Sequence, residues 1–163
     1  MPKKKNITTA MRMLDKSGVA YDTIEYDAGS EVGENFGERI AELCGLPCEM
    51  CFKTLVVRGK GGLYVACIPV CDELDLKKLA AVCGEKKVEM IHVRELLGLT
   101  GYIRGGVSPI GMKKHYRTFV DASALGAEKI VVSGGVCGIS LALAPDALLA
   151  AVPAEAADIT REK

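Results

Sequence analysis

CFKTLVVRGKGGLYVACIPV, residues 51–70, contains two β-rich runs that are separated by a Lys-Gly-Gly turn. Branched aliphatic and aromatic residues favour strands, and a short glycine-bearing connection between two such runs is typical of a β-hairpin. The stretch therefore predicts two antiparallel strands, over 51–59 and 62–70. This hairpin decides the fold class, because the segments around it mix strand and helix without strict alternation.

Apolar residues recur at helical spacing in five segments, and several of these end at glycine, the usual helix stop. The predicted helices cover 7–17, 36–45, 73–84, 93–100 and 145–152. Further strands are predicted over 19–27, 86–92, 116–125, 128–135, 139–143 and 157–160, with a polar loop at 28–35. We therefore expect a single mixed α/β (α+β) domain over 1–163. Its mostly antiparallel or mixed sheet should be curved and partly closed, with helices packed around it.

The charge balance limits the possible partners. Lysine plus arginine equals aspartate plus glutamate, at 21 each, whereas a protein that coats nucleic acid carries a basic excess. Any contact with nucleic acid should therefore be local or shared with a partner. No apolar run is long enough to span a bilayer, and the basic N-terminus is not followed by a hydrophobic stretch. These features predict a cytoplasmic protein that does not act at a membrane.

Seven cysteines are present, and three of them form the spacing Cys44-x3-Cys48-x2-Cys51. Zinc sites usually combine such a cluster with a second Cys/His pair, but the two histidines, His92 and His115, are not in a spaced pair. An odd cysteine count also argues against a disulfide framework. We expect structural thiols, no metal and no cofactor, with a metal or redox site as the alternative.

Lys53 breaks the apolar pattern of the first hairpin strand. In an alternating strand it shares a face with Leu55 and Val57, so it points toward an apolar surface or a cavity. A lysine there is desolvated unless it is paired or lines a pocket as a fixed cation. The alternative is an edge position from which the ammonium group reaches water.

Two glycine-rich breaks stand beside β-runs: GYIRGGVSPIGMKK (101–114) and VSGGVCG (132–138). Glycine lets main-chain N–H groups converge on an oxygen atom without a clash from Cβ. The first break has the spacing neither of a P-loop nor of a dinucleotide site. Each is therefore either a turn or part of a pocket wall.

Taken in order, five segments resemble the YbaK/EbsC family of aminoacyl-tRNA editing domains. They are NFGERIAELCGL, CFKTLVV, LDLKKLAAVCGEKKVEM, TGYIRGGVSPIGMKK and IVVSGG. The similarity is greatest to the YbaK-type, free-standing Cys-tRNA(Pro) deacylases, and it extends over roughly residues 7–160. It implies a YbaK-like fold and an enzyme that removes a wrong amino acid, typically cysteine, from tRNA(Pro).

The resemblance also implies a set of site residues. The family's near-invariant lysine falls on Lys53, which is implied as catalytic, and its pocket tyrosine falls on Tyr26. The Gly-Gly-[Ile/Val]-Ser-Pro run falls on Gly105, Gly106 and Ser108, and the Ser-Gly-Gly motif begins at Ser133 and Gly134. Where the family commonly has an aspartate near the pocket, this chain has Ser140. The implied substrate-binding residues are therefore Tyr26, Gly105, Gly106, Ser108, Ser133, Gly134 and Ser140.

The implied substrate is the 3′ CCA end of an aminoacyl-tRNA, with prolyl-tRNA synthetase as a transient partner and no role for DNA. No protein nucleophile is evident, so either the thiol of the bound cysteine or a water molecule attacks the ester. Two alternatives remain at this stage. One is a non-catalytic tRNA- or synthetase-binding module, which Ser140 motivates, and the other is an editing domain for another small amino acid such as alanine.

Overall fold

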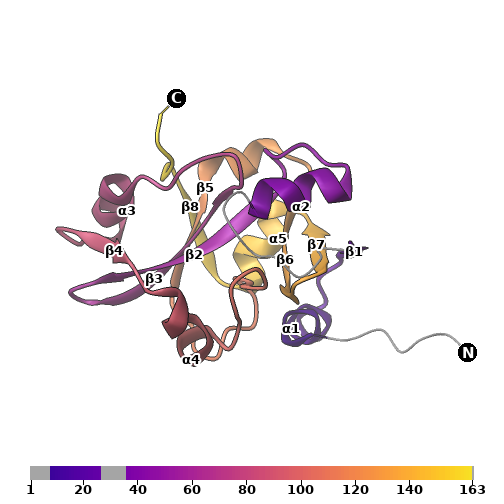
Figure 1. Ribbon diagram of the computed structural model, residues 1–163, viewed down its shortest axis with the longest axis horizontal. Coiled ribbons are helices and arrows are strands. Elements are labelled where there is room, and N and C mark those ends of the chain that lie inside the picture. The colour runs from indigo at the N-terminus through magenta and orange to yellow at the C-terminus, as the bar shows by residue number, and fades with distance from the viewer. Residues whose placement is uncertain (1–7, 27–35, 163) are drawn as a thin grey trace, which may run out of the picture.

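The computed structural model describes residues 8–26 and 36–162, in which the strands form two sheets (Figure 1). The larger sheet contains, in spatial order, β4 (Val88–Met90), β2 (Phe52–Gly59), β3 (Gly62–Pro69), β5 (Arg117–Asp121) and β8 (Ala154–Ala157). The smaller sheet contains β1 (Asp22–Glu25), β7 (Ile139–Leu143) and β6 (Ile130–Val136). The loop predicted over 28–35 lies outside the described residues.

Five α-helices and two 3₁₀ turns lie within the described ranges. They are α1 (Thr9–Ser17), α2 (Phe36–Cys44), α3 (Leu76–Cys83), α4 (Leu96–Thr100), α5 (Pro145–Ala151), η1 (Val93–Glu95) and η2 (Ala122–Gly126). Side chains at the N-caps satisfy helix N–H groups: Thr8 accepts from Met11 at 3.2 Å, and Asp75 accepts from Lys77 and Lys78. None of the described helices is long and apolar enough to cross a membrane.

Strand pairing confirms the predicted mixed fold. β2 and β3 form the expected antiparallel hairpin, while β3 pairs with β5, and β5 with β8, in parallel. The two sheets do not close into a barrel, so the expected partial closure is replaced by a junction. There, Cys51 just before β2 forms a parallel bridge with Val131 on β6.

The strands predicted over 116–125 and 157–160 differ from the observed ones for reasons that the contacts explain. The strand predicted over 116–125 stops at Asp121, because the Asp121 carboxylate accepts the Ser123 N–H at 3.2 Å and turns the chain into η2. The final strand is Ala154–Ala157 rather than 157–160. Its position is set by parallel pairing with β5, which alanine-rich sequence does not signal.

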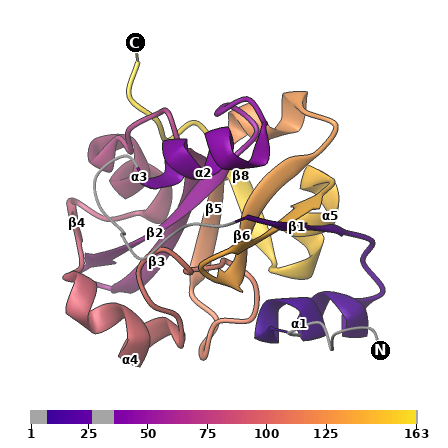
Figure 2. The same ribbon diagram turned by 45° about the vertical axis from the view of Figure 1, so that its right-hand side comes forward.

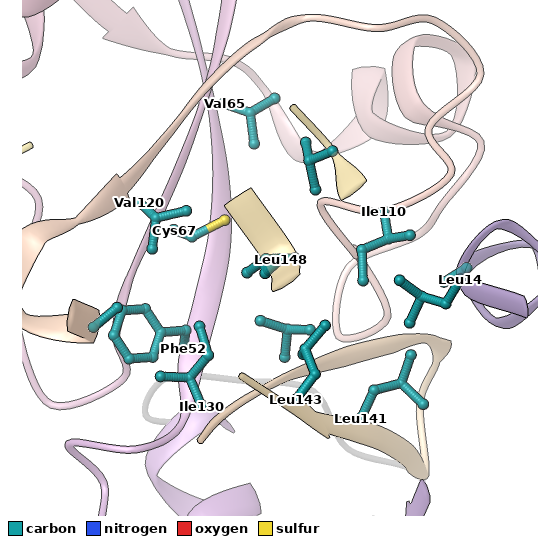
Figure 3. Packing of buried hydrophobic residues seen from close by; sticks show 14 of the residues in the cluster. Leu14, Phe52, Val65, Cys67, Ile110, Val120, Ile130, Leu141, Leu143 and Leu148 are labelled. Atoms are coloured by element: carbon teal, nitrogen blue, oxygen red, sulfur yellow. The ribbon is translucent and has the colours of Figure 1, made fainter. Parts of the chain in front are cut away.

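The main core lies between the two sheets, with α1 and α5 packed against it. Figure 3 shows side chains from both sheets meeting there, among them Phe52, Cys67, Val120, Ile130, Leu141 and Leu143. A second core packs α3 against the outer face of the larger sheet, where Leu79 meets Val57 and Ile68. A third packs Ala41 of α2 over the sheet junction (Figure 2).

Candidate functional site

The junction of the two sheets places Lys53 beside Ser133. Cys51 and Val131 form a parallel bridge, and the Val131 N–H donates to the Met50 carbonyl oxygen at 2.8 Å. Side chains two residues further along each strand return to the same face. Lys53 and Ser133 therefore project from neighbouring strands on the face that carries Cys51 and Val131.

That face is the outer one, and helices cover it on either side of Lys53. Phe52 and Val56 point into the core between the sheets, whereas Val57 packs against α3. At the other end of the strand, Cys51 packs under α2. Lys53, opposite Ile68 on β3, thus lies along the strand between the regions that α3 and α2 cover.

Lys53 is half-buried, and its ammonium group forms no ion pair with any side chain in 8–26 or 39–162. The described salt bridges instead join exposed or half-exposed side chains elsewhere, such as Arg58 with Glu95. A partly desolvated cation without a carboxylate partner in this part of the chain is suited to an anionic or strongly polar ligand.

A polar row crosses the smaller sheet on the same face as Ser133. Ser133 on β6 is directly opposite Ser140 on β7, and Ser140 is in turn opposite Ile24 on β1. The Ser140 side chain hydrogen-bonds the phenol of Tyr26, which lies two residues beyond Ile24. The main chain holds this tyrosine as well, since the Tyr26 N–H donates to the Gly138 carbonyl at 3.0 Å.

Tyr26 carries a neutral phenol at neutral pH. Burial raises its pKa above the ordinary value, and the nearby Cys137 and Cys44 thiols add to the rise. Hydrogen bonds from the Gly138 main chain and from Ser140 oppose it only in part. Tyr26 can therefore donate a hydrogen bond to a ligand.

The second half of the glycine-rich loop is anchored rather than open. Ile110 is fully buried in the core between the sheets. The Tyr102 hydroxyl donates to the Ile110 carbonyl at 2.6 Å, and the Ile110 N–H donates to Ser108 Oγ at 3.3 Å. The exposed fraction of Ser108 is 0%. Its hydroxyl therefore shapes the loop.

The first half of the loop presses against the β6–β7 hairpin. A Cβ added to Gly106 would lie 3.0 Å from Val136 Cα and 3.2 Å from Cys137 N, so the hairpin main chain would have to shift by a few tenths of an ångström to admit it. The same hairpin contains Gly138, which binds Tyr26. The contact at Gly106 thus places the loop next to the turn that holds Tyr26.

The two adjacent glycines have different roles. The Gly106 N–H donates to the Ile103 carbonyl at 2.9 Å and closes a turn, so it is already used. No acceptor for the Gly105 N–H occurs among residues 8–26 and 39–162. Gly105 has φ +90°, a left-handed conformation that side-chain-bearing residues rarely adopt. Of the pair, Gly105 offers the available main-chain donor.

Most of the expected site residues are thus brought together, in two groups. Lys53, Ser133, Ser140 and Tyr26 line one face at the sheet junction, and Gly106, which follows Gly105, packs against the hairpin beside it. Gly134, at the β-bulge of β6, is packed so closely on Ile139 that an added Cβ would lie 2.8 Å from Ile139 Cγ2. The thiols of Cys137 and Cys44 beside Tyr26 were missed by sequence reasoning, because only the folded hairpin and α2 bring them there.

Comparison with known proteins identifies the family. Residues 35–151 match the family described as the aminoacyl-tRNA editing domain. The chain belongs to this family. A protein of Enterococcus faecalis that is named as a proposed Cys-tRNA(Pro)/Cys-tRNA(Cys) deacylase, EbsC, is 45% identical over 100% of both chains.

Part of a larger protein is also similar to this chain. A proline–tRNA ligase of Thermosipho africanus is 31% identical over 60% of this chain, a region that is 17% of the ligase. The crystal structure of a proposed trans-editing enzyme for prolyl tRNA synthetase superposes with a TM-score of 0.85 at 23% identity, covering 99% of this chain and 100% of that one. The structural likeness confirms the fold.

Proposed function

We propose that this chain is a trans-editing deacylase that removes cysteine from mischarged tRNA(Pro) in the cytoplasm. The observation that carries the proposal is the 45% identity over the whole length of the EbsC protein, whose name specifies Cys-tRNA(Pro) and Cys-tRNA(Cys). The similarity to part of a proline–tRNA ligase supports the same tRNA. The geometry at the sheet junction then suggests how the ester would be held.

Lys53 is the proposed catalytic residue. Its half-buried ammonium group would lie by the terminal phosphate, the ribose or the ester carbonyl, where negative charge is present or develops during the reaction. A cation in a partly desolvated site acts more strongly than one in water. The absence of an ion pair among the described residues supports this role, because no internal carboxylate there competes with the ligand.

The remaining site residues would position the aminoacyl end. The Gly105 N–H is the proposed donor to the carbonyl oxygen, with Gly106 and Ser108 fixing the loop that presents it. Tyr26, Ser140, Ser133 and Gly134 would form the wall against the amino acid. Ser140 offers a neutral hydroxyl where the family commonly has an aspartate, so the neutral phenol of Tyr26 and this hydroxyl would together bind the polar groups of the amino acid.

The proposed reaction needs no protein nucleophile. The sulfur of the bound cysteine attacks its own ester carbonyl, a C–S bond forms and the C–O bond to the ribose breaks. The thiol proton passes to the departing ribose oxygen, leaving free tRNA and a cysteine thiolactone. Intramolecular attack gains a large effective molarity. Attack by water is the alternative and gives free cysteine instead.

A panel of tRNA(Pro) charged with cysteine, alanine or serine tests the substrate assignment. We expect purified protein to release cysteine at least about 100-fold faster than alanine or serine if the substrate thiol is the nucleophile. Mass spectrometry of the first product separates thiolactone from cysteine. Equal rates for cysteine and alanine would exclude the thiol mechanism, and tRNA binding without release of any of the three would favour a binding module.

We further propose that the chain works in a transient complex with prolyl-tRNA synthetase. Its formal net charge is 0, and phosphate neutralisation supplies much of the affinity for nucleic acid. The isolated protein should therefore bind tRNA weakly, with addition of the synthetase strengthening binding. Equilibrium binding at several salt concentrations measures this effect. Tight, salt-insensitive binding of tRNA by the isolated chain would contradict the proposal.

A further inference from the structure

Two thiols and a carboxylate converge at the open end of the β2–β3 hairpin. The donor atoms of Cys48, Glu49 and Cys71 all lie within 4.8 Å of one another. Cys48 and Cys71 are half-buried, whereas Glu49 is exposed. In addition, the side chains of Cys48 and Cys71 are hydrogen-bonded to each other.

The hairpin register explains why these distant residues meet. Phe52 is opposite Pro69, and the Val70 N–H donates to the Cys51 carbonyl at 2.8 Å, so the pairing continues beyond both strand ends. The residues just before β2 therefore lie beside those just after β3. The sequence gives no local sign of this, because Cys71 is far along the chain from the Cys44-x3-Cys48-x2-Cys51 run.

Main-chain hydrogen bonds fix both segments. In the turn before β2, the Met50 N–H donates to the Pro47 carbonyl at 3.1 Å, and the Cys51 N–H donates to the Cys48 carbonyl at 3.3 Å. After β3, the Asp72 N–H donates to the Pro69 carbonyl at 3.0 Å. The donor atoms are therefore held close together by the fold itself, so little ordering would be needed for them to bind one ion.

The surroundings are apolar on one side and open on the other. Cys48 packs against the core under α2, together with Cys51 and Val70. Glu49 is exposed to solvent. A site with two half-buried thiols and one exposed carboxylate suits a cation that binds both sulfur and oxygen.

We propose that Cys48, Cys71 and Glu49 bind a zinc ion, with water in the fourth position. Zinc accepts thiolate and carboxylate ligands in tetrahedral geometry, whereas magnesium and calcium prefer oxygen alone and cuprous ion prefers sulfur alone. Binding releases the two thiol protons to solvent. The ion would join the turn before β2 to the turn after β3, close to the start of the strand that carries Lys53. This site is independent of the deacylase proposal.

Zinc affinity of the reduced, chelator-treated protein tests the site without any activity assay. Zinc is titrated against a chromophoric chelator, and cobalt is added separately to look for the absorption of tetrahedral cobalt–thiolate coordination. The variants are Cys48→Ser, Cys71→Ser and Glu49→Gln. Cys137→Ser is the matched control, because Cys137 is an exposed free thiol outside the cluster.

We expect one zinc per chain in the wild type and in Cys137→Ser. Losing a residue that merely supports a zinc ligand weakens zinc binding by roughly 10–100-fold. Losing a direct ligand should cost more, so Cys48→Ser and Cys71→Ser should each weaken zinc binding by at least about 100-fold. Both variants should also lose the cobalt–thiolate absorption bands. Glu49→Gln should weaken binding and keep those bands. Wild-type protein that binds no zinc, or either serine variant that binds zinc as the wild type does, would overturn the proposal.

Discussion

Replacing Lys53 with methionine should lower the rate of Cys-tRNA(Pro) deacylation by about 10²–10³-fold or more, as expected for loss of a fixed group that stabilises developing charge. Methionine keeps an unbranched apolar stem in the half-buried position next to Ile68, so the fold should persist. Single-turnover decay of the ester measures the rate, and circular dichroism with thermal unfolding confirms that the variant is folded.

Lys60→Met is the matched control for Lys53→Met. Lys60 lies on the same hairpin, but it is exposed in the turn between β2 and β3. Its removal changes the net charge of the protein by the same amount, and we expect near-wild-type deacylation. A folded Lys53→Met protein with the wild-type rate would remove Lys53 from the proposed mechanism.

The second large effect is expected for Gly105→Ala. Alanine keeps the main-chain N–H but should shift the backbone at this φ and so misplace the donor, and losing a correctly placed oxyanion donor costs about 10²–10³-fold in rate. In the proposed mechanism, an alanine Cβ would also enter the space in which the ester approaches the main chain. Because Gly105 has φ +90°, alanine should also lower the free energy of unfolding, by about 1–2 kcal/mol. Deacylation rate and chemical denaturation are measured on the same preparation.

Gly84→Ala separates the effect of backbone strain from that of lost substrate space. Gly84 ends α3 with φ +77°, and nothing lies within 4 Å of a Cβ built there. The Gly84→Ala protein should lose about as much free energy of unfolding as Gly105→Ala, while its deacylation rate stays at the wild-type value. If Gly105→Ala deacylates as fast as Gly84→Ala, the glycine-rich loop is a turn without a role in the reaction.

Local sequence signals predicted much of the fold. The Lys-Gly-Gly turn marked the β2–β3 hairpin, and glycine marked the ends of α1 and α3. Local signals failed where a distant contact decided the outcome. The strand Ala154–Ala157 exists because β5 pairs with it, and within the described residues the backbone link between the two sheets is the bridge between Cys51 and Val131.

The candidate site was predictable only in part. Lys53 stood out because a charged residue interrupted an apolar strand, but its neighbour Ser133 follows from the bridge at the sheet junction. Ser108 and Gly106 were expected at the pocket wall, and their contacts stabilise the conformation of the loop. Ser108 is buried, and the Gly106 N–H closes a turn. Such roles depend on hydrogen bonds that residue types alone do not specify.

The most direct test of the deacylase proposal compares Cys-tRNA(Pro) with correctly charged Pro-tRNA(Pro) in the presence of catalytic amounts of the purified chain. We predict that the cysteine ester disappears over many turnovers while the proline ester decays only at its rate in buffer. Decay of Cys-tRNA(Pro) no faster than in buffer would contradict the proposed activity, and equal loss of both esters would contradict an editing role.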